Sequence, residues 1–187
     1  MPLPTRRLLL HLPLAGLILM FGSGAATAQA TSAAARETPW ESLMPQGWDP
    51  MKEFRAGDAA LVPEGSVKER NLMRQMREIW DNAPTNPKMD GAQVRLPGYV
   101  VPLEELKGEL KEFLLVPYFG ACVHSPPPPS NQIVHVIASS PLKGVRTMDA
   151  VWVNGTLTVQ RTDSAMGVSS YQIKAPAVEP YVVKERR

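Results

Sequence analysis

The clearest helical pattern of hydrophobic positions lies in residues 66–83. Its apolar residues recur three or four positions apart, at Leu72, Met76, Ile79 and Trp80. Ser66 and Glu69 have the spacing of a capping box, and Pro84 ends the pattern. The segment therefore predicts one amphipathic helix. We expect its Met and Trp side chains to pack in the core rather than to bind a ligand.

After this helix the pattern changes to short apolar runs rich in Val, Ile, Tyr and Thr, bounded by Gly, Pro and Asn. Such runs are typical of strands. The expected strands are residues 92–102, 113–119, 131–138, 149–159 and 167–178. A flat sheet would leave its edges exposed, whereas a small barrel hides them. The pattern predicts a mainly β fold, a small five-stranded, OB-like, partly open barrel with an N-terminal helical segment.

Two segments in this region are compatible with more than one conformation. Residues 103–113, "LEELKGELKEF", are charged and predict a short helix or a turn. Asn154 and Gly155 fit a tight hairpin turn, but Gly155 also fits a bend within one long strand. We expect the bend, because small barrels need bent strands and the runs on either side are short for a hairpin.

The first thirty residues have the pattern of a secretory signal peptide. Arg6 and Arg7 precede an apolar run, and "ATAQA" supplies the small residues of a cleavage site. The run is short for a membrane span, so we expect cleavage after Ala30 and a soluble periplasmic protein; the alternative is an uncleaved N-terminal anchor. The expected organisation is a signal peptide (1–30), a leader and irregular segment (31–65), the amphipathic helix (66–83) and the β-barrel domain (84–187).

Signal cleavage changes the charge balance of the chain. The whole sequence has 20 Lys and Arg against 18 Asp and Glu, and residues 1–30 contain two of the basic residues and none of the acidic ones. Residues 31–187 are therefore neutral overall and suit a single domain. Nonspecific nucleic-acid binding depends on clustered Lys and Arg, so we expect no nucleic-acid partner.

The candidate chemistry lies in residues 120–132, "GACVHSPPPPSNQ". Cys122 is the only cysteine, and His124 and His135 are the only histidines after the signal peptide. Pro126–Pro129 form a stiff polyproline II segment that cannot enter a helix or a sheet interior. In an extended segment, residues two apart face the same side. We therefore expect Cys122 and His124 to project together from a rigid loop.

Three kinds of chemistry are open to Cys122. A thiolate and an imidazole suit Zn²⁺ or Cu⁺, with His135 as a further candidate ligand, and such a site keeps an open position. Cys122 is also compatible with a buried structural cysteine, or with a reactive thiol whose thiolate His124 stabilises. The sequence has no nucleotide-binding, nucleophile-elbow, zinc-protease or Cys-x-x-Cys motif. An enzyme is therefore the less favoured class.

The same loop also suits a docking surface for a partner protein, or a rigid connector between strands. Its prolines remove conformational entropy in advance, so the side chains it presents are held in place. The residues expected at this loop surface are Tyr118, Phe119, Pro126, Pro127, Pro128, Pro129, Asn131 and Gln132.

"RLPGYVVPLE", "EFLLVPYFGACVHSPPPPSNQIVHV", "VWVNGTL" and "SSYQIKA" resemble an exported bacterial family of unknown function, numbered 3299. The resemblance spans about residues 90–180. It implies export, an OB-like barrel and, for some members, a link to zinc-responsive ABC-type transport. The positions that match the family motif are Cys122, His124, Pro126 to Pro129, Asn131 and Gln132. His135 stands where the family more often has an aromatic residue.

The expected function is a soluble periplasmic metal-binding accessory protein, with zinc as the metal. An inner-membrane ABC permease or another periplasmic protein is the expected partner, and no stable membrane insertion is expected after signal cleavage. The alternatives are a thiol-dependent enzyme or redox protein that uses Cys122, and an interaction module that presents the polyproline loop without a metal.

Overall fold

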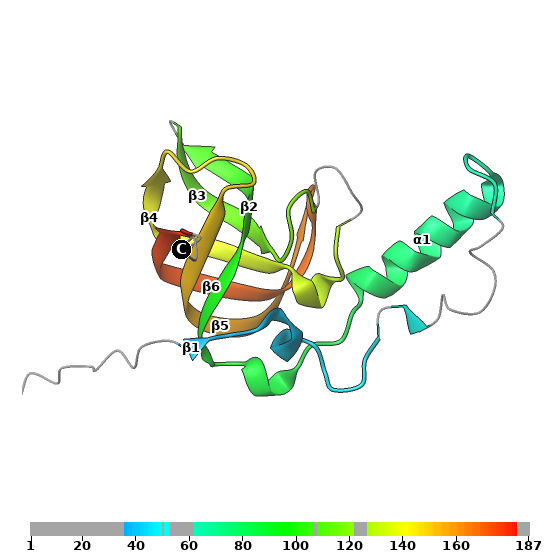
Figure 1. The fold of residues 1–187 in the computed structure, drawn as a ribbon, viewed down its shortest axis with the longest axis horizontal. Helices are drawn as coiled ribbons and strands as arrows, with labels where there is room; N and C mark the ends of the chain where they lie inside the picture. Colours follow the sequence, from blue (N-terminus) through cyan, green and yellow to red (C-terminus); the bar gives the residue numbers. More distant parts are fainter. Residues whose placement is uncertain (1–35, 50, 53–61, 107, 122–126, 183–187) are drawn as a thin grey trace, which may run out of the picture. The chain divides into compact units, whose positions relative to one another are not determined.

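The computed structural model describes residues 36–49, 51–52, 62–106, 108–121 and 127–182. The strands are β1 (Arg36–Glu37), β2 (Gln93–Leu106), β3 (Glu109–Val116), β4 (Val134–Lys143), β5 (Ala150–Ser164) and β6 (Gly167–Pro180). The α-helix is α1 (Val67–Asp81), and the short 3-10 helices are η1 (Trp40–Leu43), η3 (Pro87–Met89) and η4 (Ser130–Gln132) (Figure 1).

Five strands form a closed barrel in the order β2-β3-β4-β6-β5, with β5 pairing back to β2. The closing pair is antiparallel and joins Gln93–Tyr99 to Ala150–Thr156. The β4–β6 pair is parallel, and the short strand β1 runs parallel beside β2. This order, with one parallel pair, is that of an OB-like barrel. The predicted mainly β, five-stranded fold with an N-terminal helical segment is confirmed.

The charged segment 103–113 forms most of a β-hairpin, so the short helix considered for it is wrong. Leu106 pairs with Glu109, and Gly108 between them has φ +80°. Lys107 lies outside the described residues. Strand pairing outweighs the helical propensity of this Glu-, Leu- and Lys-rich stretch, because strand formation depends mainly on cross-strand packing.

The barrel interior holds the main apolar cluster. Alternation along β3 divides its side chains between two clusters, since Phe113 and Leu115 join the main cluster while Leu114 and Val116 join a second one. The second cluster consists of Val101, Leu114, Val116, Ala121 and Ile133. The second half of β3, Phe113 to Val116, is thus buried on both faces, which fixes the position at which the chain leaves the strand.

The N-terminal segment around η1 packs on the barrel core. Leu43 is fully buried, and the Trp40 indole N–H donates to the main-chain oxygen of Pro97 at 2.7 Å. The Tyr171 hydroxyl donates to Leu43 O at 2.7 Å and accepts from Asn86 N–H at 2.7 Å. One buried phenol therefore joins β6 to two segments that precede the barrel in sequence.

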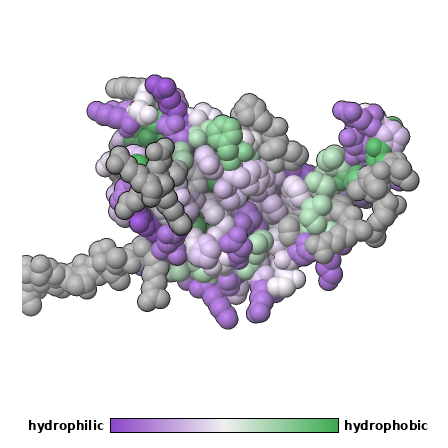
Figure 2. Space-filling model, in the orientation of Figure 1, coloured by the Kyte–Doolittle hydropathy of each residue, from purple (hydrophilic) through white to green (hydrophobic). Residues whose placement is uncertain are grey.

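Helix α1 begins as the sequence predicts, with Ser66 Oγ accepting from Glu69 N–H at 3.1 Å. The Glu69 carboxylate accepts from Gly65 N–H, one residue before the position a capping box requires. No residue of α1 is buried, so the prediction that its Met and Trp side chains pack in the core is wrong. The barrel strands and η1 fill the core, and Figure 2 shows hydrophobic residues on the surface of α1 beside hydrophilic ones.

The carbonyl of Asp81, at the end of α1, accepts a hydrogen bond from the Arg161 guanidinium on β5.

In the part of the chain that the structure describes, no helix has the length and apolar character needed to span a membrane.

The predicted bend at Gly155 is confirmed. Strand β5 runs without a break through this residue, and its register against β6 shifts between Asn154 and Thr156. A Cβ at Gly155 would lie 2.6 Å from Ile173 Cγ2 and 3.0 Å from Lys174 O. Only glycine allows the two strands to approach this closely.

We expect Gly155→Ala to lower the free energy of unfolding by about 1–3 kcal/mol, because the added methyl group overpacks the β5–β6 contact. Urea denaturation measures the change. Gln160→Ala, an exposed change on the same strand, is the control and should stay within about 0.5 kcal/mol of the parent. Equal stability of the alanine variant and the parent would contradict this account of Gly155.

We expect Tyr171→Phe to lower the free energy of unfolding by about 0.5–1.5 kcal/mol, because Leu43 O and Asn86 N–H each lose a hydrogen bond and keep only their bond to each other at 3.3 Å. Burial raises the pKa of Tyr171 above 10.0, although its hydrogen bond with Asn86 works in the opposite direction. The unfolded chain thus loses this proton first, and stability declines as the pH rises above about 10.

Chemical denaturation between pH 8 and about pH 11 tests this dependence. The alkaline decline should be smaller in Tyr171→Phe than in Tyr181→Phe, a control at a partly exposed tyrosine. The same alkaline slope in both variants would contradict the assignment to Tyr171.

Candidate functional site

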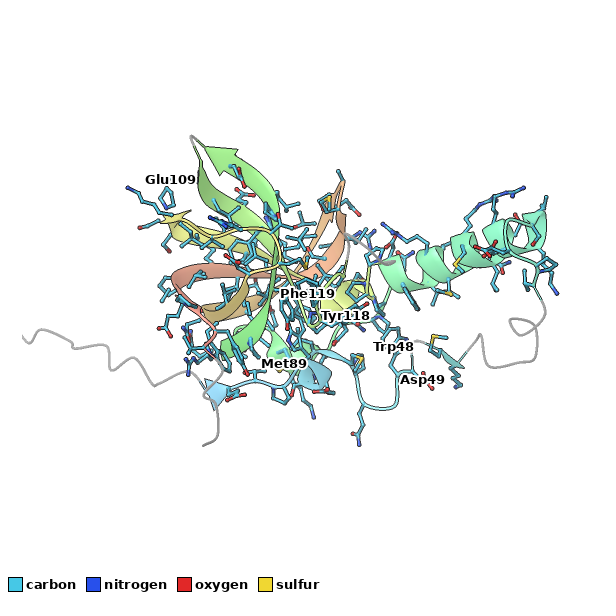
Figure 3. All side chains as sticks on the ribbon, turned by 45° about the horizontal axis from the view of Figure 1, so that its top comes forward. Trp48, Asp49, Met89, Glu109, Tyr118 and Phe119 are labelled. Carbon is cyan, nitrogen blue, oxygen red and sulfur yellow. The ribbon has the colours of Figure 1, made fainter. Side chains whose placement is uncertain are left out.

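The proline-rich loop, residues 117–133, connects β3 to β4, and the structure describes both of its ends. On the outgoing end, Tyr118 and Phe119 are 46% and 67% exposed. Figure 3 shows these two residues next to each other. The Phe119 ring meets the Tyr99 ring edge to face, with centroids 5.7 Å apart, and Gly120 N–H contacts Met148 Sδ at 3.2 Å. Ala121 is fully buried, so this end is held against the barrel up to the residue before Cys122.

The returning end of the loop is held by side-chain amides. Asn131 is fully buried, and its Nδ2 donates to Pro84 O at 2.9 Å. Gln132 Nε2 donates to Trp40 O at 3.0 Å. These bonds fasten the loop to segments that precede the barrel. Asn131 and Gln132 therefore direct their amide N–H groups into the protein.

Asn131 also carries an unsatisfied acceptor. Its Oδ1 is buried and has no hydrogen-bond partner among the described residues. A buried acceptor of this kind costs free energy unless a donor reaches it. A hydrogen-bond donor that reached this oxygen, such as the ring N–H of a metal-binding histidine, would therefore be stabilised there.

Three of the predicted site residues, Cys122, His124 and Pro126, lie outside the described residues. Of the other prolines, Pro128 is buried, and Pro127 and Pro129 are half-buried. The rings next to the returning anchor thus pack on the protein instead of standing free.

His135 is 5% exposed and has a partner at each ring nitrogen. Its Nε2 lies 3.1 Å from Glu112 Oε2, and its Nδ1 lies 3.3 Å from Gln172 Nε2. The Gln172 amide donates only to an unprotonated Nδ1, so this arrangement places the imidazole proton on Nε2, toward Glu112. Neither nitrogen is left free for a metal ion in this geometry. Within the described ranges, no group of three or more His, Cys, Asp or Glu side chains converges as a metal site.

Sequence analysis did not single out Tyr99, which packs on Phe119. The two residues come together because Tyr99 on β2 pairs with Val116 at the end of β3. Strand register between distant segments produces this contact. The aromatic content of the strand at 92–102 was the only sequence signal for it.

Comparison with known proteins agrees with the resemblance carried by the loop motif. A family model described as "Protein of unknown function (DUF3299)" matches residues 40–180. The crystal structure of a DUF3299 family protein from Pseudomonas aeruginosa PAO1 is 36% identical, covers 81% of this chain and 99% of that chain, and superimposes with a TM-score of 0.64. A comparison with curated proteins finds no match. The family match spans the whole proline-rich loop and both of its anchors.

We expect Asn131→Ala to reduce the free energy of unfolding by about 1–3 kcal/mol, because it removes the bond to Pro84 O and leaves a small cavity. Urea unfolding measures the loss. Asn71→Ala, at an exposed position of α1, is the matched control and should be neutral or slightly stabilising. Equal effects of the two substitutions would show that Asn131 does not anchor the loop.

Proposed function

Since the chain belongs to the DUF3299 family, which is defined without a function, we propose from its own chemistry that it is an exported, non-enzymatic zinc-binding accessory protein. Cys122 and His124 are the proposed protein ligands of the metal. A thiolate and a neutral imidazole are preferred zinc donors, and two protein ligands leave positions open for exchange. An open site suits transient binding and transfer better than a structural role.

The fixed ends of the proline-rich loop support this proposal. Ala121 is fully buried immediately before Cys122, and Asn131 is fully buried seven positions after His124. Polyproline sequence stiffens the connection between the two anchors. A segment confined at both ends loses less entropy when its side chains bind a metal, which favours affinity from few ligands.

The observation that carries the proposal is the buried Oδ1 of Asn131, for which the described part of the chain supplies no hydrogen-bond partner. A histidine that binds zinc through one nitrogen almost always donates its other ring N–H to an oxygen acceptor. The loop that contains His124 supplies such an acceptor already buried, and Asn131 belongs to the same sequence motif. The residues present thus suit a zinc-bound histidine.

His135 is left out of the proposed ligand set. Both of its ring nitrogens have partners, in Glu112 and Gln172, and freeing one for a metal would leave a buried polar group unpaired. In this proposal His135 stabilises the packing of β4 against β3 and β6.

The proposal also includes a location and a partner. Signal cleavage after Ala30 would release the protein into the periplasm. An inner-membrane ABC permease or another periplasmic protein would receive the metal or be controlled by it. The exposure of Tyr118 and Phe119 supports such a contact, because exposed aromatic side chains are frequent at protein interfaces.

The same exposure favours a second candidate, an interaction module that uses the proline-rich loop without a metal. A third candidate, a thiol-dependent enzyme or redox protein, rests on Cys122 alone. The three differ in what Cys122 does, because only the metal and thiol functions require its sulfur.

Zinc titration of the purified protein under reducing conditions tests the proposal. We expect about one zinc per chain, with affinity lowered at least about tenfold in Cys122→Ser and in His124→Ala because each removes a ligand. His135→Gln should retain zinc, since its nitrogens already have partners.

Absence of stoichiometric zinc in the parent protein would overturn the proposal. Loss of zinc only in His135→Gln would show that the ligand set is wrong. If the metal-free protein alkylates rapidly at Cys122 and binds no zinc, the thiol function replaces the metal function.

A further inference from the structure

A pocket of about 210 Å³ lies beside the proline-rich loop, where the N-terminal segment meets the barrel. Its wall is formed by Trp40, Pro97, Tyr99, Pro117 and Tyr181. These residues come from η1, from the middle of β2 and from the chain immediately after β3 and β6. Strand pairing and the packing of η1 on the barrel therefore create the pocket from separate parts of the chain.

A hydrogen bond fixes the side of the pocket wall that Trp40 and Pro97 form. Trp40 is 9% exposed, and its side-chain N–H donates to Pro97 O at 2.7 Å. That bond uses the indole donor and occupies the Pro97 carbonyl. Trp40 consequently offers a ligand its ring and no hydrogen bond from its side chain.

The polar groups left on these side chains are the hydroxyls of Tyr99 and Tyr181. Neither hydroxyl has a hydrogen-bond partner among the described residues. None of the side chains that line the pocket is charged. The side chains that line the pocket thus supply aromatic and proline surfaces, and two of them carry a phenolic hydroxyl.

This chemistry selects among classes of ligand. A phosphate or carboxylate would lack a cationic partner, and a sugar would lack the carboxylate and amide side chains that hold its hydroxyl groups. A proline-rich main chain has carbonyl acceptors and no N–H at its prolines, and its rings pack on aromatic faces. Aromatic grooves that bind polyproline II segments combine the same features.

We infer that this pocket binds a proline of an extended, polyproline II segment from a partner protein, with the Tyr99 and Tyr181 hydroxyls donating to its main-chain carbonyls. Pro128 of the chain's own proline run is buried in its own fold, so it is not the occupant. The site requires neither zinc nor Cys122. The inference therefore goes beyond the proposed function and does not depend on it.

The surroundings of the pocket give the segment room to continue. A second hollow of about 270 Å³ shares Ala150 and Tyr181 with the first. Its lining includes Lys143, Asp149 and Glu179, so it is more polar. A polyproline II chain rises about 3.1 Å per residue, and polar residues that flank the bound proline would reach this second hollow.

Titration of the purified protein with an acetylated octaproline peptide tests the inference, with a Gly-Ser peptide of the same length as the ligand control. Tryptophan fluorescence and amide NMR shifts report binding. We expect saturable binding of the proline peptide alone, with the largest shifts at Gly98, Ala150 and Tyr181. Added chelator should not change it, which separates this result from the zinc titration.

Three variants locate the site. Tyr181→Ala should weaken binding at least about tenfold, because it removes an aromatic wall and a donor. Tyr99→Phe keeps the ring and should weaken binding a few-fold. Val182→Ala, next to the pocket at a side chain 75% exposed, should leave binding unchanged. Thermal melts establish that each variant is folded.

No saturable binding, or equal binding of the Gly-Ser peptide, would overturn the inference. Binding of a chitin oligosaccharide with no binding of octaproline would also overturn it and assign the pocket to sugars. Proline binding that Tyr181→Ala and Tyr99→Phe leave intact would place the site elsewhere on the protein.

Discussion

The Tyr171 hydroxyl is the contact on which the arrangement of this protein depends. It donates to Leu43 O, 128 positions away in sequence, and accepts from Asn86 N–H. The phenol is buried in the barrel core. Its bonds, together with the direct bond from Asn86 N–H to Leu43 O at 3.3 Å, hold two segments that have little regular structure of their own. Those segments provide Trp40 and Pro84, whose carbonyls anchor the returning end of the proline-rich loop.

The proline-rich loop and the aromatic pocket therefore depend on some of the same residues. Trp40 accepts from Gln132 through its carbonyl and lines the pocket with its ring. Pro117 begins the loop and forms another part of the pocket wall. A change that loosens η1 would disturb both places, whereas changes at Cys122 or at Tyr181 would act on one of them. The proposed metal site and the proposed peptide site can accordingly be tested separately.

Some elements of the fold can be predicted from the sequence and others cannot, for physical reasons. The strands could be predicted because β-branched and aromatic residues recur within runs bounded by turn residues. The bend at Gly155 could be predicted because the runs on either side are short for a hairpin and a small barrel needs bent strands. Segment 103–113 was ambiguous because its Glu, Leu and Lys favour a helix locally, and pairing with neighbouring strands decided otherwise. Helix α1 was expected to join the core because amphipathicity shows that one face is apolar but does not show what covers it.

The sequence by itself determined the family, the strand content, the helix start at Ser66 and the residue types available for metal chemistry, because all of these are local patterns. Tertiary structure alone decided that both nitrogens of His135 have partners and that Tyr99 lies against Phe119. It also decided that the buried Asn131 Oδ1 has no hydrogen-bond partner among the described residues. These contacts join residues far apart in the chain. They depend on strand register and barrel closure, which no local pattern specifies.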